Sequence, residues 1–276
     1  MSVISCHIEQ NIANVTLTNA AVGNALGRAF WDEFPPLIEA LQNNPEVHVV
    51  VLTAEGKHFC VGIDLPFAQS VFLGPGDEAV RQHRIDEIIA MQDVFHALET
   101  LDVPVIAAIH GACIGAGVEL ASCADIRLCS QDAMFALKEI QLAIIPDLGG
   151  LQRLPRQLPH GVARELAFTG RNFSASEAQQ WQWVNQCYPD QDSVHSAAQH
   201  MAKQMAAFAP RAMRHIKRSM VEADAAHDLQ AMRDLITPQV DECITVDMRE
   251  ALQAAAEKRP AQFPKRPVND KKLLAL

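Results

Sequence analysis

The sequence predicts an α/β fold in which most strands run parallel. Over residues 3–137, short apolar runs rich in β-branched residues alternate with longer segments of helical periodicity. Such runs are typical of strands buried on both faces of a parallel sheet. The helices between them supply the crossovers that parallel pairing needs. From residue 149 onward the pattern is mainly helical, so we expect a helical region to follow the sheet.

The first part of the chain predicts a hairpin, a helix and a buried strand. Residues 3–9 and 14–18 alternate in polarity around a turn-prone stretch, which predicts an opening hairpin. Residues 25–44 have helical spacing, but the Pro35-Pro36 pair predicts a break within them. Residues 47–53 predict a buried strand, because the run is short, apolar and β-branched.

The central part predicts a loop, a long helix and several short elements. Residues 65–76 contain two prolines and two glycines and predict a loop. Residues 77–100 have an amphipathic helical pattern, and residues 104–109 predict a second buried strand. A short helix at 116–122 and short strands at 126–129 and 134–137 are predicted next.

The last part of the chain is predicted to be a series of helices. They are expected at residues 151–157, 161–169, 175–182, 193–208 and 210–225, with a further helical stretch to about residue 258. One strand at 184–188 interrupts the series, and the Lys- and Pro-rich residues 259–272 predict a frayed or partner-docked tail. We therefore expect a core over residues 1–200 and a helical region with a tail over residues 201–276.

Composition restricts the class of protein. With 276 residues, 49% of them hydrophobic, the chain can bury one large core. A formal net charge of −10 argues against nucleic acid as a partner. The N-terminus lacks a signal-peptide pattern and no run approaches eighteen apolar residues, so we expect a soluble cytoplasmic protein with no membrane partner. Seven cysteines without a C-x-x-C pair favour reduced thiols.

Two Gly-containing turns about fifty residues apart are the most informative motifs. Residues 58–65 and 110–120 each follow an apolar run, so both turns could point free N–H groups at one small anion. In an enzyme that anion is often an oxygen whose charge develops during the reaction. The glycines at 111, 115 and 117 do not match a dinucleotide fingerprint, and no phosphate-binding P-loop or metal-ligand spacing is present. We therefore expect no nucleotide and no metal.

Three acids lie close to these turns in the predicted fold. Glu119 belongs to the second turn, Glu139 follows a predicted strand, and Asp147 precedes two glycines. All three could line one pocket. The structural alternatives are that Glu119 interacts with the dipole of its helix and that Asp147 caps the next helix. The residue pattern alone leaves both readings open.

Five segments occur in a specific order along the chain. They are Phe59-Cys-Val-Gly-Ile-Asp-Leu65, His110-Gly-x-x-x-Gly-Ala-Gly-Val-Glu119, Ala124-Asp-Ile-Arg127, Lys138-Glu139 and Ile145-Pro-Asp-Leu-Gly-Gly-Leu-Gln-Arg-Leu154. Together they resemble the crotonase (enoyl-CoA hydratase/isomerase) superfamily over about residues 3–260. The resemblance implies a core of repeated ββα units and a C-terminal helical region that assembles trimers or hexamers.

The resemblance also implies an acyl-CoA substrate and no separate cofactor. The backbone N–H groups of Ile63 and Ala116 would form an oxyanion hole that holds the thioester oxygen as it becomes an enolate. Asp64 is expected to cap a helix as well as to line the site. The substrate-binding residues that the resemblance implies are Cys60, Val61, Gly62, Asp64, Leu65, Gly115 and Gly117.

The three acids divide the reactions that the resemblance implies. In hydratase-like members, acids matching Glu119 and Glu139 add water to a 2-enoyl-CoA. In dienoyl-CoA isomerase-like members, an acid matching Asp147 shifts protons along a conjugated chain, with Glu139 as its partner. Asp147 favours the isomerase, from 3,5-dienoyl-CoA to 2,4-dienoyl-CoA in fatty-acid breakdown. Such isomerases have Asp in place of Glu119, so hydration stays an alternative.

A member of the same superfamily that binds RNA or has no catalytic activity is a further alternative. The three acids and the net charge of −10 argue against it.

Overall fold

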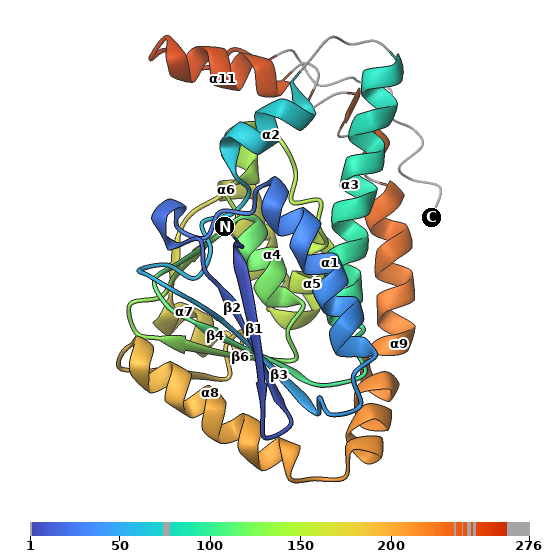
Figure 1. Cartoon of the computed structure of the whole chain (residues 1–276). Helices are drawn as coiled ribbons and strands as arrows, with labels where there is room; N and C mark the ends of the chain where they lie inside the picture. Colours follow the sequence, from blue (N-terminus) through green and yellow to red (C-terminus); the bar gives the residue numbers. More distant parts are fainter. Residues whose placement is uncertain are drawn as a thin grey trace.

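Six strands form the main sheet, and helices lie on both of its faces (Figure 1). The computed structural model describes residues 2–73, 78–234, 236–238, 240–241, 244 and 247–263. The strands, in spatial order, are β1 (Ile4–Glu9), β2 (Ile12–Leu17), β3 (Val49–Ala54), β4 (Val105–Ile109), β6 (Ile126–Ser130) and β9 (Gln186–Tyr188). β1 and β2 form an antiparallel hairpin, and each later pair is parallel. The predicted α/β class and its parallel pairing are confirmed.

A second, three-stranded sheet lies beside the predicted site. It contains β5 (Ala112–Ile114), β7 (Met134–Ala136) and β8 (Phe173–Ser174). β5 is part of the second Gly turn and pairs in parallel with β7. The sequence pattern missed β5 and β8, because two or three residues are too few to establish a period of two.

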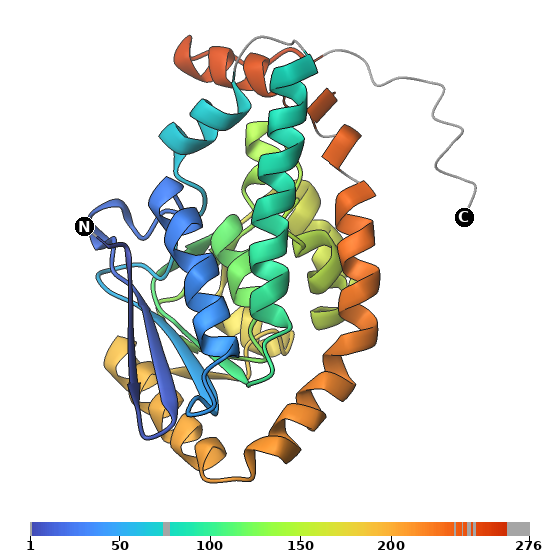
Figure 2. The same ribbon diagram turned by 45° about the vertical axis from the view of Figure 1, so that its right-hand side comes forward.

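Eleven helices and two 3₁₀ turns lie in the described part of the chain. The helices are α1 (Arg28–Gln42), α2 (Leu65–Phe72), α3 (Glu78–Glu99), α4 (Ala116–Ser122), α5 (Gly150–Gln157), α6 (His160–Thr169), α7 (Ala175–Gln180), α8 (Gln191–Ala206), α9 (Pro210–Asp234), α10 (Ile236–Pro238) and α11 (Met248–Ala256). The 3₁₀ turns are η1 (Ala20–Val22) and η2 (Glu139–Leu142). Figure 2 shows α1, α3 and α9 side by side, while α8 lies across the opposite face of the sheet.

The alternation of side chains along the strands divides the core into two layers. Val49 and Val51 of β3 pack with Ala198 of α8 on one face. Val50 and Leu52 point to the other face and belong to the larger cluster beneath α1 and α3. This larger cluster supports the ends of the strands from which both Gly turns emerge.

The predicted break in the first helix does not occur. α1 continues through Pro35 and Pro36 although each removes a helical hydrogen bond. Pro36 is exposed and Pro35 half-buried, so both lie away from the core. On the other side, Phe30 and Phe34 stack with ring centroids 4.7 Å apart, and both rings are buried. Burial of this aromatic face outweighs the lost hydrogen bonds.

The loop predicted at residues 65–76 is wrong over its first part, where α2 forms. Asp64 caps this helix by accepting a hydrogen bond of 2.8 Å from the N–H of Phe67. Pro66 lies in the first turn, where a helix needs no N–H donor. Phe67, Val71 and their neighbours bury one face of the helix. Residues 74–77 of the predicted loop lie outside the described residues.

The C-terminal helices share the buried core of the preceding chain. Ile236, Val240 and Met248 belong to the larger hydrophobic cluster. The predicted division at residue 200 stays a prediction, but the buried cluster is continuous across it. Most of the predicted tail, from residue 264 onward, lies outside the described residues. In the described part of the chain, no helix has both the length and the apolar character to cross a bilayer.

One ion pair, buried at its lysine end, joins α9 to Asp125 beside the start of β4. The Nζ atom of Lys217, which is 5% exposed, donates to Asp125 Oδ2 at 2.8 Å and to the carbonyl of Val103 at 3.0 Å. The same Asp125 oxygen accepts the N–H of Val105 at 2.7 Å. This arrangement anchors the C-terminal region to the sheet.

We expect Lys217→Met to lower the free energy of unfolding by about 1 kcal/mol, because it removes the ion pair and the hydrogen bond to Val103 while Asp125 stays open to water. Urea unfolding followed by circular dichroism measures the change. Lys203→Met on the exposed side of α8 is the matched control and should cost less than about 0.5 kcal/mol. Equal losses in the two variants would contradict an anchoring role for Lys217.

Candidate active site

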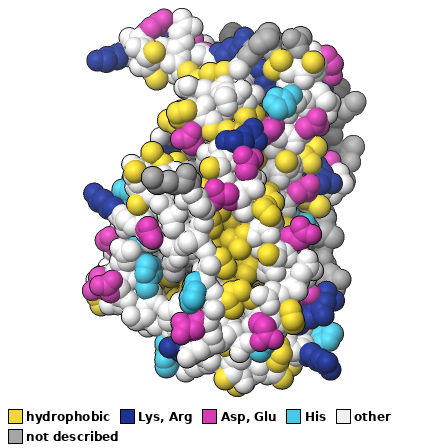
Figure 3. Space-filling view, in the orientation of Figure 1, with side chains coloured by type: hydrophobic (Ala, Val, Ile, Leu, Met, Phe, Trp, Pro, Cys, Tyr) yellow, Lys and Arg dark blue, Asp and Glu magenta, His cyan; other side chains and the backbone are white. Residues whose placement is uncertain are grey.

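A cavity of about 490 Å³ brings both Gly turns and all three predicted acids together. Its wall includes residues 61–65 of the first turn, Gly115 and Ala116 of the second, and Glu119, Glu139 and Asp147. A second hollow of about 650 Å³ lies between α1 and α3 and contains none of the predicted site residues. On the face of the molecule seen in Figure 3, hydrophobic side chains gather near the middle. The candidate chemistry therefore belongs to the first cavity.

The first turn presents the N–H of Ile63 at the cavity wall. The carbonyl of Leu26 accepts the N–H of Asp64, and the N–H of Leu26 donates to the carbonyl of Gly62. Between them, the N–H of Ile63 has no acceptor among the described residues. Gly62 has a φ of +100°, and a Cβ there would lie 2.9 Å from the carbonyl oxygen of Ile114. Glycine therefore allows the two turns to approach closely.

The second turn leaves the N–H of Ala116 free at the same wall. Gly115, with a φ of +53°, precedes α4, and its carbonyl accepts the N–H groups of Val118 and Glu119. The N–H of Ala116 comes before these bonds and has no acceptor in the described chain. A Cβ on Gly62 would lie 3.7 Å from this nitrogen, so the two turns are adjacent.

Two residues predicted to bind substrate lie behind the turns instead of lining the cavity. A Cβ on Gly117 would lie 2.5 Å from the carbonyl oxygen of Cys60. Cys60 is buried, and its backbone bonds to Ala112 and Ile114 join the first turn to β5. Burial raises the pKa of the Cys60 thiol to about 12, so it is protonated at neutral pH. Both residues hold the turns together.

Glu119 contacts the loop that carries Asp147. Its Oε1 accepts the N–H of Leu148 at 3.0 Å and that of Gly150 at 2.8 Å. The side chain is buried, and burial raises its pKa to about 7, although these two N–H groups and the charge of Arg153 oppose the rise. Glu119 therefore does more than interact with the dipole of its helix, because its carboxylate also binds this loop.

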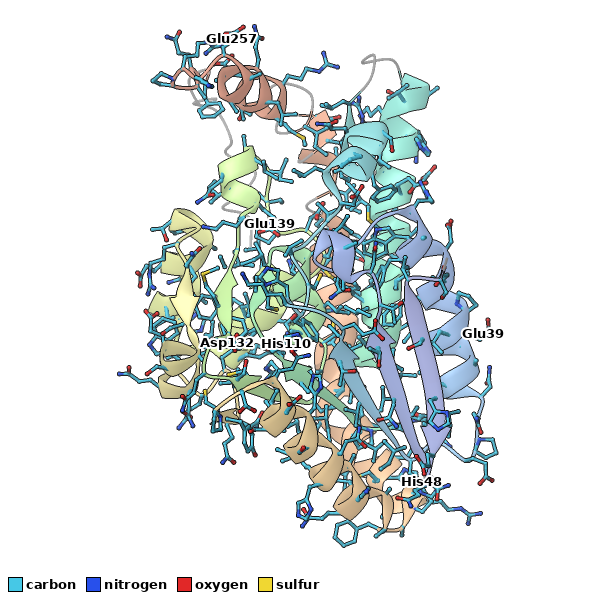
Figure 4. The ribbon with its side chains drawn as sticks, turned by 60° about the vertical axis from the view of Figure 1, so that its left-hand side comes forward. Glu39, His48, His110, Asp132, Glu139 and Glu257 are labelled. Carbon is cyan, nitrogen blue, oxygen red and sulfur yellow. The ribbon has the colours of Figure 1, made fainter. Side chains whose placement is uncertain are left out.

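Glu139 lies at the start of η2 (Figure 4). A Cβ on Gly115 would lie 2.8 Å from Glu139 Oε1, which places this oxygen beside the free N–H of Ala116. The residue as a whole is half-buried, but Oε2 is enclosed and has no partner in the described chain. Burial, followed by the charges of Glu119 and Asp147, raises the pKa of Glu139 well above its ordinary value.

Asp147 lies on the cavity wall beside Glu139 and does not cap the next helix. Gly149 is the N-cap residue of α5, and no side chain caps that helix. The backbone carbonyl of Asp147 accepts a hydrogen bond of 2.8 Å from Gln92 Nε2 on α3. Asp147 is thus held through its backbone.

Three residues behind the acids were not predicted from the sequence. Gln92, Glu99 and Arg153 are buried or nearly so and contact the loop at residues 147–150 or each other. Arg153 belongs to the last quoted motif and could have been noticed there. Gln92 lies within α3 and Glu99 ends it, and no local motif marks either of them. In the described part of the chain, no group of three or more His, Cys, Asp or Glu could hold a metal ion.

The raised pKa of Glu119 predicts a pH-dependent stability. Its carboxyl titrates near 4.5 when exposed and near 7 in the folded chain, so stability present below the lower value is lost as the pH rises through the higher one. Between about pH 5 and about pH 8, we expect the free energy of unfolding of the wild type to fall by on the order of 2 kcal/mol more than that of Glu119→Gln. Gln keeps an oxygen for the two N–H donors. Urea unfolding across this range measures the difference, and parallel profiles would contradict the prediction.

Known proteins match nearly the whole of this chain. The sequence profile of the family described as Enoyl-CoA hydratase/isomerase matches residues 7–266. A protein of Arabidopsis thaliana named Delta(3,5)-Delta(2,4)-dienoyl-CoA isomerase, peroxisomal, is 35% identical over 96% of this chain and 97% of its own. The mitochondrial protein of that name from Rattus norvegicus is 33% identical over 92% and 79%.

A solved structure named an enoyl-CoA hydratase, from Bacillus anthracis, is 31% identical, with a TM-score of 0.73, over 95% of this chain and 98% of its own. Relatives named for both reactions therefore share this fold. The family match spans residues 7–266, the range in which both turns and all three acids lie. This chain belongs to the enoyl-CoA hydratase/isomerase family of enzymes.

Proposed function

We propose that this enzyme converts 3,5-dienoyl-CoA to 2,4-dienoyl-CoA in fatty-acid breakdown. The observation that carries the proposal is the position of Asp147, which shares one cavity with Glu139 and the free N–H groups of Ile63 and Ala116. The rest of the wall suits an acyl chain, because it includes apolar side chains such as Phe72 and Met248. The names of the relatives from Arabidopsis thaliana and Rattus norvegicus support the same reaction.

The reaction removes one proton from the substrate and returns one at another carbon. It transfers no electrons to or from a cofactor. Loss of a proton from C2 of the 3,5-diene gives an enolate conjugated with both double bonds. Protonation at C6 then leaves double bonds at C2 and C4. The negative charge lies largely on the thioester oxygen, and the N–H groups of Ile63 and Ala116 would stabilise it there. The proposed chemistry needs only the CoA thioester and no separate cofactor.

The two proton transfers need acids at different places along the chain. Glu139 Oε1 lies against Gly115, beside the N–H of Ala116, so Glu139 is suited to act at C2 next to the thioester. Asp147 comes from the next loop and is suited to act at C6. Protonation of Asp147 removes one of the negative charges that raise the pKa of Glu139. The first transfer needs an ionised Glu139 and the second needs a protonated Asp147, so loss of the Asp147 charge would assist the first transfer.

Hydration of a 2-enoyl-CoA is the second candidate function. Glu119 and Glu139 both line the cavity and could hold a water between them. The structure from Bacillus anthracis carries the name of this activity. Glu119 Oε1 already accepts two backbone N–H groups, which leaves Oε2 for water.

Assembly and location are further parts of the proposal. We propose a trimer or a pair of trimers built through the C-terminal helices, which analytical ultracentrifugation would test. The cytoplasmic location stays a prediction, and the relatives cited above are named as peroxisomal and mitochondrial proteins.

Ultraviolet absorbance distinguishes the two reactions. Isomerisation brings the diene into conjugation with the thioester, whereas hydration removes conjugation from a 2-enoyl-CoA. We expect Asp147→Asn to lower kcat for isomerisation by about 10²- to 10⁴-fold, since it removes one proton-transfer group. The same variant should alter hydration by less than about tenfold. Unchanged isomerisation in Asp147→Asn would rule out the proposed role.

The close approach of the turns predicts a second effect on activity. Ala at position 62 would place its Cβ against the Ile114 carbonyl and displace the N–H of Ile63. We expect Gly62→Ala to lower kcat about 10²-fold, the usual cost of losing one oxyanion donor. Gly161→Ala is the control, because a Cβ there meets nothing within 4 Å. Equal kcat values in the two variants would contradict the oxyanion role.

A further inference from the structure

The loop at residues 147–150 is fixed from both sides by buried side chains. On one side, Glu119 binds the N–H groups of Leu148 and Gly150. On the other, Arg153 Nη1 donates to the carbonyl of Leu148 at 2.8 Å. The peptide groups that follow Asp147 are therefore held through both donors and acceptors.

Arg153 is itself fixed by an ion pair. Its Nη2 lies 2.9 Å from Glu99 Oε2, and the side chain of Arg153 is fully buried while that of Glu99 is 12% exposed. A buried guanidinium keeps its charge, so a partner such as Glu99 is needed to offset the cost of burial. The pair joins α5 to the end of α3 directly beneath the loop.

The space at Gly149 shows how closely Arg153 supports the loop. A Cβ on Gly149 would lie 1.9 Å from Arg153 Nη1 and 2.8 Å from Met232 Sδ. Gly149 also has a φ of +101°, which a side chain would strain. The guanidinium thus lies in contact with the backbone of the loop.

Gln92 holds the preceding carbonyl. Its Nε2 donates to the backbone carbonyl of Asp147 at 2.8 Å and, more weakly, to that of Met232 at 3.4 Å. Gln92 is fully buried, so these carbonyls replace water as its partners. Successive carbonyls, of Asp147 and Leu148, are therefore bound by donors from α3 and α5.

We propose that Arg153, held by Glu99, is a positioning residue for the isomerisation. It fixes the loop so that Asp147 stays on the cavity wall while Glu119 stays bound to the Leu148 and Gly150 N–H groups. This inference rests on the proposed function. The loop is thereby held by Arg153 through the carbonyl of Leu148 and by Glu119 through the N–H groups of Leu148 and Gly150.

A positioning role makes a specific kinetic prediction. The free N–H groups that would bind the thioester belong to other turns. Loosening the contact between Arg153 and the loop should therefore lower kcat and leave KM nearly unchanged. Loss of the Arg153 charge should also raise the pKa of Glu119, which that charge lowers. A protonated Glu119 no longer adds the negative charge that raises the pKa of Glu139. The acid limb of the kcat profile should therefore move to lower pH.

Arg153→Met, Arg153→Lys and Glu99→Gln test the inference in the full-length enzyme. We expect Arg153→Met to lower kcat about 30-fold, with KM within about threefold of wild type and the acid limb moved to lower pH. Arg153→Lys keeps the charge and should recover the pH profile and part of kcat. Glu99→Gln should lower kcat about fivefold by loosening the guanidinium.

Arg127→Met is the matched control. Arg127 is also buried and donates to the carbonyls of Trp183 and Ala124, away from the loop. It should lose stability but keep the kcat and pH profile of wild type. The same kinetic change in Arg127→Met, or a wild-type kcat in folded Arg153→Met, would overturn the inference.

Further outcomes distinguish a failure to fold, a failure of the proposed function and a failure of the positioning role. If Arg153→Met does not fold, Glu99→Gln and Gln92→Leu decide, and wild-type kcat and pH profiles in both would overturn the inference. A wild type that hydrates 2-enoyl-CoA and does not isomerise would instead overturn the proposed function. If the wild type isomerises and the variants at Arg153, Glu99 and Gln92 keep its kcat and pH profile, only the positioning role is overturned.

Discussion

The two hydrogen bonds from Leu148 and Gly150 to Glu119 are the constraint on which the site depends. They join α4, which emerges from the second Gly turn, to the loop that carries Asp147. Without them, the oxyanion donors and the acids would belong to separately placed segments. The cost is a buried carboxyl whose pKa is raised, as expected where stability is exchanged for function.

The parallel sheet makes this meeting of distant segments possible. β3 and β4 are neighbours and run in the same direction, so the turns that follow them emerge at the same edge. Cys60 and Gly117, though buried away from the cavity, keep these turns in contact. The site is therefore a product of strand order as much as of its catalytic side chains.

Sequence patterns predicted the long elements well because burial imposes a clear period. β3, β4 and α3 lie within one or two residues of the expected bounds. The errors arose where tertiary packing outweighed local preference, as in α1, where an aromatic face keeps the helix continuous through Pro35 and Pro36. In the site, motifs located the turns and the acids. They could not locate Gln92 or Glu99, whose contacts are with residues more than fifty positions away.

Gln92 shares its amide between the loop of Asp147 and the carbonyl of Met232 in α9. The sulfur of Met232 also lies where a side chain at Gly149 would have to go. One wall of the catalytic apparatus therefore comes from the last quarter of the chain, although no proposed catalytic group does. Exchange of this region between relatives by recombination would keep every acid and still replace a support of the loop. The two parts of the chain are thus constrained to evolve together.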